Sequence, residues 1–166
     1  MSGLSTSFTP MVGGCSCGAV RYSLSQRPMI VHCCHCRDCQ AQGGGAFAIN
    51  ALIETKYVDV ASGEIDAVAM PSPSGRGHDI HRCRHCRVAV WSDYGYRPYL
   101  RFVRVSTLDD AHAVAPDVHI FTRSKVPWVT LPPEQLAFDI YYDIEAVWRP
   151  DSLERRKAML AAAQVH

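Results

Sequence analysis

The residues best suited to chemistry are eight cysteines, which fall into three tight clusters along the chain. Thiolates one or two residues apart can converge on one zinc ion from a tight turn, whereas a disulfide needs Cα atoms about 5.5 Å apart in a paired geometry. The spacing therefore predicts zinc–thiolate chemistry, and a secreted protein held by disulfides is the alternative. The clusters contain Cys15 and Cys17; Cys33, Cys34, Cys36 and Cys39; and Cys83 and Cys86.

The alternation of side chains along an extended strand sorts the central cluster. Residues i and i+2 point to the same face, so Cys34 pairs with Cys36 while Cys33 points the other way. We therefore expect Cys33 to be a small buried residue rather than a ligand. Seven ligands remain, and they divide most simply into four and three.

A structural zinc site is closed by four protein ligands, whereas a catalytic site keeps one position open. The closed site would join two distant segments through Cys15, Cys17, Cys83 and Cys86. The open site would be borne on a compact turn by Cys34, Cys36 and Cys39. We expect the zinc at the open site to be lost more readily, because it has one fewer protein ligand.

A histidine that closes the second site is the alternative to an open position. His35 lies between two of the ligands and is expected to point away from them. The histidines near the clusters in sequence are His32, His35, His78, His81 and His85.

The rest of the sequence bears on the cellular location of the protein and on the partners that it can bind. The start of the chain has no basic stretch followed by an apolar run, and no part approaches the roughly 20 apolar residues of a membrane span. We expect a cytoplasmic protein, where thiols stay reduced and serve metal binding or catalysis. With 17 basic and 16 acidic residues, the chain is not expected to bind nucleic acid or a membrane surface. The oligomeric state stays open.

The charges are unevenly distributed along the chain. Residues 76–104 hold seven arginines against Asp79 and Asp93, whereas residues 134–154 hold six acidic residues against Arg149. Two interpretations of the arginine stretch remain open. The arginines lie on solvated faces of alternating strands, or they form a wall beside the metal that attracts anions.

Most of the chain is predicted to be β structure in one domain. Short runs rich in β-branched and aromatic residues are separated by Gly, Pro, Ser and Asp, and neither of the longer loops, 70–77 and 107–116, is long enough to link two domains. The predicted strands lie within residues 19–24, 29–33, 45–52, 57–61, 65–70, 79–83, 88–93, 99–108 and 117–123.

The end of the chain is predicted to be a helix over residues 152–164. Asp151 followed by Glu154 resembles a capping box, and the following residues are good helix formers. Leu153 and Leu160, a heptad apart, would dock the helix on the sheet. The basic residues of the helix are expected to face water mostly: Arg155, Arg156 and Lys157.

Several motifs together resemble the glutathione-dependent formaldehyde-activating enzyme family. They are GGCSCGAVRY, CHCRDCQ with the following glycines and GAFA, HRCRHCRVAVW, STLDD, AP with HIF, and Trp128 before TLPP. The resemblance implies a β-tent zinc fold of several short antiparallel sheets, shared with a Rab-binding exchange chaperone and centromere protein V. It places a zinc-binding domain at residues 12–140, and residues 141–166 would form a helical extension packed on it.

The resemblance also implies the roles of the cysteines. Cys15, Cys17, Cys83 and Cys86 would hold a structural zinc, and Cys34, Cys36 and Cys39 a catalytic one. Arg87 departs from the family, which usually has glycine directly after the last cysteine. Arginine in a turn with positive φ would be strained by about 1 kcal/mol.

The activity implied by the resemblance is that of a carbon–sulfur lyase or synthase acting on S-hydroxymethylglutathione, the adduct of glutathione and formaldehyde. The partner would then be a small thiol such as glutathione, held through its carboxylates by arginines that the sequence does not identify. One alternative is a non-catalytic zinc scaffold that binds a protein partner. Another is a redox switch in which oxidation of Cys33 and Cys34 releases zinc.

Overall fold

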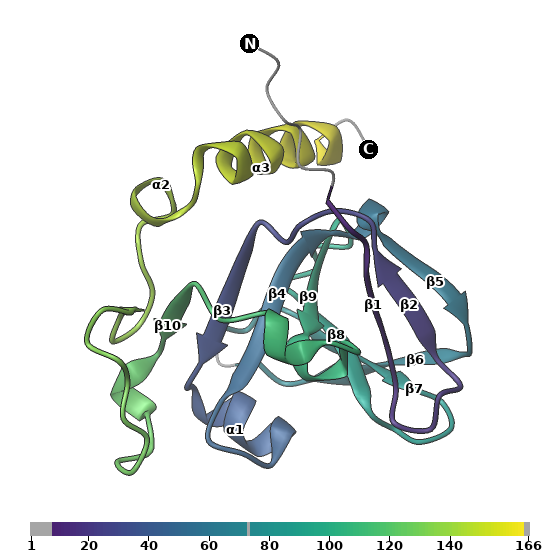
Figure 1. Cartoon of the computed structure of the whole chain (residues 1–166), viewed down its shortest axis with the longest axis horizontal. Coiled ribbons are helices and arrows are strands. Elements are labelled where there is room, and N and C mark those ends of the chain that lie inside the picture. The colour runs from purple at the N-terminus through teal and green to yellow at the C-terminus, as the bar shows by residue number, and fades with distance from the viewer. Residues whose placement is uncertain (1–7, 73, 165–166) are drawn as a thin grey trace.

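A computed structural model describes residues 8–72 and 74–164. These residues form two β-sheets with a helix at the C-terminal end (Figure 1). The smaller sheet has the antiparallel order β1-β2-β5, with β1 at Met11–Gly14, β2 at Arg21–Leu24 and β5 at Val58–Ser62. The described part leaves out residues 1–7, 73 and 165–166. The prediction that the chain starts without a signal sequence, one residue of the predicted loop 70–77 and the end of the predicted helical extension therefore lie outside it.

The larger sheet has the order β11-β10-β3-β4-β9-β8-β7-β6. Its strands are β3 (Ile30–Cys34), β4 (Ala48–Glu54), β6 (Ile65–Met70), β7 (His78–Cys83), β8 (Ala89–Tyr94), β9 (Leu100–Arg104), β10 (Val118–Ile120) and β11 (Leu136–Ala137). Short 3₁₀ helices lie at Thr55–Tyr57, Val105–Thr107, Ala111–Ala113 and Thr122–Ser124. The mainly β fold with a C-terminal helix agrees with the sequence-based expectation.

Each of the nine predicted runs overlaps one observed strand, whereas β1 and β11 were not predicted. Strand β1 reads MVGG, and its two glycines weaken any strand pattern. Strand β11 has only two residues. One edge of the larger sheet also departs from an antiparallel arrangement, because β10 pairs in parallel with both β3 and β11.

The hydrophobic core has two parts. In the first, Tyr22 of the smaller sheet packs edge-on against Trp91 of the larger one, with ring centroids 5.6 Å apart. In the second, Tyr142 and Trp148 pack with Met29 at the start of β3. Because Tyr142 and Trp148 belong to the segment before the C-terminal helix, that segment contributes to the core. The division into residues 12–140 and 141–166 stays a prediction.

Two helices lie in the C-terminal segment, α2 (Ile144–Val147) and α3 (Pro150–Ala163). Helix α3 crosses the ends of the strands (Figure 1). It begins with Pro150, and Arg149 is its N-cap residue, so the capping box predicted at Asp151 is not formed. Leu153 packs on the second core cluster, as predicted. The prediction that Arg155 faces water is wrong, because its guanidinium pairs with the buried Glu54. No helix in the described residues is long and apolar enough to cross a membrane.

Candidate metal centres

The clamp cluster consists of Cys15, Cys17, Cys83 and Cys86, whose sulfurs all lie within 4.8 Å of one another. The Sγ atom of Cys17 lies 3.4 Å from that of Cys15 and 3.9 Å from that of Cys83. Four sulfurs at 2.3 Å from a tetrahedral ion lie about 3.8 Å apart, so the four residues fit a zinc ion. The structure brings together the group of four that the sequence predicted for a closed site.

Two similar turns supply these sulfurs. In the first, the N–H of Gly18 donates to the carbonyl of Cys15 over 3.1 Å; in the second, the N–H of Arg87 donates to the carbonyl of Cys83 over 2.9 Å. Both donors have left-handed backbones, with φ of 78° at Gly18 and 64° at Arg87. Arg87 therefore adopts a left-handed conformation that favours glycine.

The environment of Cys15 favours a thiolate. Burial acts to raise the pKa of this thiol, but the 3.2 Å hydrogen bond from the N–H of Val20 and contacts with the other three thiols outweigh it. Together they lower the pKa of Cys15 to about 6. Zinc binds thiolates, so this arrangement favours metal binding near neutral pH.

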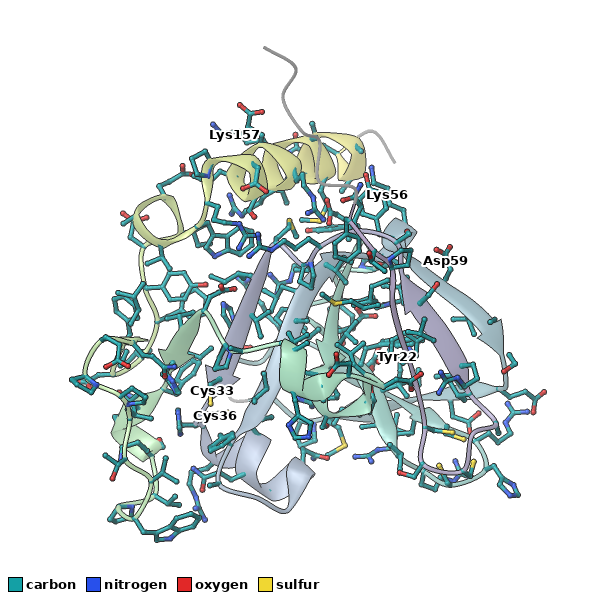
Figure 2. All side chains as sticks on the ribbon, viewed as in Figure 1. Tyr22, Cys33, Cys36, Lys56, Asp59 and Lys157 are labelled. Atoms are coloured by element: carbon teal, nitrogen blue, oxygen red, sulfur yellow. The ribbon has the colours of Figure 1, made fainter. Side chains whose placement is uncertain are left out.

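The cleft cluster consists of Cys34, Cys36 and Cys39, whose sulfurs also lie within 4.8 Å of one another. Cys34 ends β3, Cys36 caps the N-terminus of helix α1 (Arg37–Gly43), and Cys39 lies in its first turn, where its N–H donates to Cys36 Sγ over 3.4 Å. Figure 2 shows Cys36 at the lower end of β3. The predicted turn is thus the start of a helix.

The pKa values of the thiols in the cleft cluster are shifted in opposite directions. Contacts with the thiols of Cys34 and Cys39 lower the pKa of Cys36, and contacts with Cys36 and Cys39 raise that of Cys34. Arg104 is buried nearby and donates to Asn50 Oδ1 over 2.5 Å and to Ser92 Oγ over 3.1 Å. No carboxylate in the described residues forms a salt bridge with Arg104. The positive charge of Arg104 therefore favours the thiolate form of the cysteines in the cleft cluster.

The cleft cluster lines a cavity of about 790 Å³, between the larger sheet and the C-terminal segment. This cavity is the cleft after which the cluster is named. This volume is in the range of small-molecule sites, about 300–1,000 Å³. Tyr94 also lines the cavity, and burial together with the charges of the three thiols raises the pKa of its hydroxyl, which favours the protonated form. Cys33 lies on the opposite face of β3 and is 1% exposed, as the alternation predicted.

Among the described residues, four arginines line this cavity together with a single carboxylate, that of Asp38. Only one of them, Arg97, belongs to the arginine-rich stretch 76–104. Other members of that stretch are engaged elsewhere: Arg84 and Arg87 pair with Asp66, and Arg101 pairs with Asp93. The positive lining therefore comes from four separate segments through Arg37, Arg97, Arg123 and Arg156.

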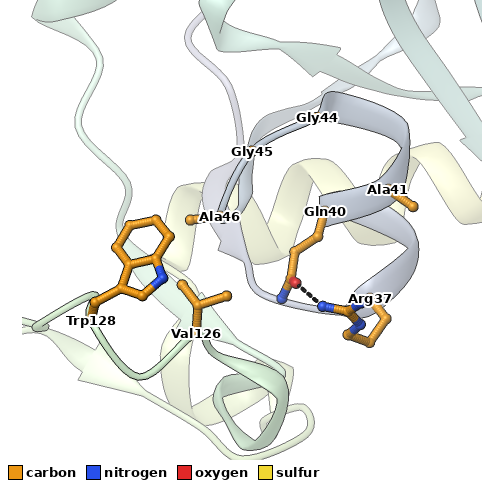
Figure 3. Close-up of a pocket in the computed structure, with 8 residues that line it drawn as sticks. All are labelled: Arg37, Gln40, Ala41, Gly44, Gly45, Ala46, Val126 and Trp128. Carbon is orange, nitrogen blue, oxygen red and sulfur yellow. Dashed lines mark hydrogen bonds between the residues drawn. The ribbon is translucent and has the colours of Figure 1, made fainter.

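A second pocket, of about 410 Å³, lies on another side of α1 (Figure 3). Trp128, 76% exposed, faces the helix across this pocket together with Val126. Arg37 lines both cavities and donates to Gln40 Oε1 over 2.6 Å. Helix α1 thus separates the two cavities.

No histidine in the described residues joins the cleft cluster. His32 Nε2 instead contacts the hydroxyl of Tyr142 at 2.5 Å, and His78 stacks on Tyr94 with ring centroids 3.9 Å apart. His35 points to the other face of β3, where it forms a third group with Cys33 and His119. The alternation along the strand predicted the direction of His35, but no local pattern indicated this group, because His119 lies 84 residues farther along the chain.

The family of the chain follows from one comparison with known proteins. No curated protein matches the chain. A solved structure of a Rhodobacter sphaeroides protein is 22% identical, with a TM-score of 0.46 over 64% of this chain and 92% of that chain. The profile of the glutathione-dependent formaldehyde-activating enzyme family matches residues 10–124, which include both predicted ligand sets. The chain therefore belongs to the glutathione-dependent formaldehyde-activating enzyme family.

Proposed function

We propose that the protein is a zinc-dependent carbon–sulfur lyase or synthase that exchanges a small aldehyde with glutathione or a similar thiol. The observation that carries the proposal is the cleft cluster, in which three sulfurs meet at the wall of a large cavity rich in guanidinium groups. Family membership supports the same chemistry. The clamp cluster would hold a structural zinc and have no part in the reaction.

The donor set of the cleft cluster suits a soft ligand. A zinc ion held by Cys34, Cys36 and Cys39 would carry a formal charge of about −1, and it would supply an open position that lowers the pKa of a bound thiol. Arg104 offsets part of that charge from within the protein interior. Such a site is better suited to sulfur than to the generation of hydroxide.

The arginines account for recognition of the thiol. Glutathione is a tripeptide with two carboxylates, and guanidinium groups bind carboxylates in a planar, two-pronged geometry. Arg37, next to Cys36, and Arg123, in the short 3₁₀ helix after β10, both line the cavity. Binding of the carboxylates would place the thiol near the three sulfurs and reduce the entropic barrier to reaction.

The reaction needs no oxidant or reductant. In the synthetic direction, the S–H bond of the thiol breaks and a carbon–sulfur bond forms to the aldehyde carbon, while the proton ends on the former carbonyl oxygen. Because burial raises the pKa of the Tyr94 hydroxyl, the group keeps its proton and can donate a hydrogen bond to that oxygen. In the reverse direction the same hydrogen bond stabilises the departing carbonyl group.

Calorimetric titration of the zinc-loaded protein with glutathione tests binding, and exchange-rate measurements by NMR with formaldehyde test catalysis. We expect saturable heat and adduct exchange faster than the spontaneous rate. S-methylglutathione is the matched ligand control, because it retains both carboxylates but has no free thiol. We expect it to bind more weakly than glutathione.

The variant Cys36→Ser should remove both binding and catalysis while the protein stays folded. Equal binding of glutathione and S-methylglutathione would mean that the cavity recognises the peptide without using the metal. No heat beyond dilution and no acceleration of exchange would favour the zinc scaffold that binds a protein partner.

A further inference from the structure

A third group of metal-binding side chains lies on the face of β3 opposite the cleft cluster. It contains Cys33, His35 and His119, all buried, whose ligand atoms lie within 4.8 Å of one another. We propose that Cys33 Sγ, His35 Nε2 and His119 Nδ1 bind a third metal ion of the zinc type. This proposal is independent of the reaction proposed above.

The separations of the ligand atoms fit such an ion. His35 Nε2 lies 3.5 Å from Cys33 Sγ and 3.0 Å from His119 Nδ1. Around a tetrahedral zinc, with bonds of about 2.3 Å to sulfur and 2.0 Å to nitrogen, such atoms lie about 3.3–3.6 Å apart. A shift of a few tenths of an ångström would therefore bring His35 Nε2 and His119 Nδ1 to the separation of two nitrogen ligands on one zinc ion.

A hydrogen bond outside the group orients one of the ligands. The Nε2–H of His119 donates to Gln135 Oε1 over 2.5 Å, so Nδ1 carries the lone pair and faces Cys33 and His35. Histidine ligands of metals usually donate their other N–H to a protein oxygen in this way. Gln135 therefore supplies the outer contact that such a site requires.

A metal-free hydrogen-bond chain is the competing explanation. In that case the Nε2–H of His35 donates to His119 Nδ1, and His35 Nδ1 becomes a bare acceptor. Among the described residues this buried atom has no hydrogen-bond partner. With a metal on His35 Nε2, the same Nδ1 atom would be an N–H donor without a partner, at a similar cost of about 1–3 kcal/mol. The proposal therefore rests on the separations of the ligand atoms and on the contact of His119 with Gln135.

The group connects two strands of the larger sheet. It joins β3 to β10, which pairs with β3 only through a short parallel stretch that sets His119 opposite Cys33. Phe47 covers His35, with ring centroids 5.4 Å apart. Directly after β10, Phe121 and Arg123 line the cleft, so an ion here would hold that wall of the cleft in place.

X-ray absorption at the zinc edge distinguishes this site from the other two. The clamp and cleft clusters contain only sulfur ligands, so scattering from imidazole rings bound to zinc would come from the third site alone. We expect imidazole scattering in the full-length zinc-loaded protein, and its loss together with about one zinc per chain in His119→Asn. His112→Asn is the matched control, because His112 is exposed and lies outside the group.

Three results would overturn the proposal. The first is a wild-type spectrum with sulfur ligands only, and the second is an imidazole signal that survives in a folded His119→Asn variant. Cys33→Ala provides a second test if His119→Asn does not fold, since it removes the only sulfur and should also release about one zinc. Full zinc content in Cys33→Ala is the third.

Discussion

Arg155 of helix α3 donates two hydrogen bonds to the carboxylate of Glu54, over 2.9 and 2.5 Å. Glu54 ends β4 and is 3% exposed, so this ion pair ties the C-terminal helix to the centre of the larger sheet. Arg155 also donates to the carbonyl of Arg27, which further fixes the helix.

Replacing Arg155 by methionine should lower the free energy of unfolding by about 2–4 kcal/mol, because it leaves a buried carboxylate without its partner. Urea denaturation measures this change. Lys157→Met is the control, since Lys157 is exposed on the same helix and its loss should change stability by less than about 0.5 kcal/mol. Equal effects of the two substitutions would contradict the role of the ion pair.

The protein should be more stable with glycine than with alanine at position 87, in the turn after Cys86. Both substitutions remove the exposed pairing of Arg87 with Asp66, so their difference reports the backbone at φ 64°. We expect Arg87→Gly to exceed Arg87→Ala in unfolding free energy by about 1 kcal/mol. An alanine variant as stable as the glycine variant would show that the turn is not strained.

The clamp and cleft clusters should respond differently to loss of one thiol. Cys83→Ser should release about one zinc per chain and unfold or aggregate the protein, because metal-binding energy is part of its folding energy. Cys36→Ser should also release about one zinc but leave the melting temperature close to that of the wild type. Elemental analysis and thermal melting test both. An unchanged melting temperature and zinc content in Cys83→Ser would refute the structural role of the clamp.

Two arginines of the 76–104 stretch should differ in their effect on glutathione binding. Arg97 lines the cleft, whereas Arg84 pairs with Glu64 and Asp66 at the surface. Arg97→Gln should weaken binding about tenfold, or about 1.4 kcal/mol, and Arg84→Gln should leave it unchanged. Calorimetric titration at low and high salt checks this, because the Arg97 contribution should also shrink as salt screens it.

The hydroxyl of Tyr94 should matter for exchange of the aldehyde rather than for folding. We expect Tyr94→Phe to slow adduct exchange about tenfold or more while glutathione still binds, because the hydrogen bond forms to the reacting oxygen. Tyr96→Phe is the control, since Tyr96 is 76% exposed and does not line the cleft. Equal exchange rates for Tyr94→Phe and the wild type would remove Tyr94 from the reaction.

Local patterns predicted most of the strands and both groups of cysteines, because each depends on spacing within a few residues. Helix α1 was missed since it is short and begins inside the cysteine cluster. One signal could have revealed it: Gly44, in the glycine run, ends the helix with φ 65°, and its N–H donates to Gln40 O.

Apart from the clamp cluster, features that depend on contacts between distant segments could not be predicted. The pairing of Arg155 with Glu54 spans 101 residues, so a helix considered alone places that arginine in water. The positive lining of the cleft likewise comes from four separate segments rather than from the arginine-rich stretch. The group of Cys33, His35 and His119 needed the parallel pairing of β3 with β10, which nothing in either segment indicates.

Side chains alternate between the two faces of β3, and this alternation restricts how the length of the strand can change in evolution or engineering. Cys33 and His35 face one way and Cys34 and Cys36 the other, so insertion or deletion of one residue before Cys33 would exchange the two faces. The thiols of the cleft would then enter the interior, and the buried group would face the cavity. Only changes of two residues preserve both faces, so this strand can be lengthened or shortened in pairs but not by single residues.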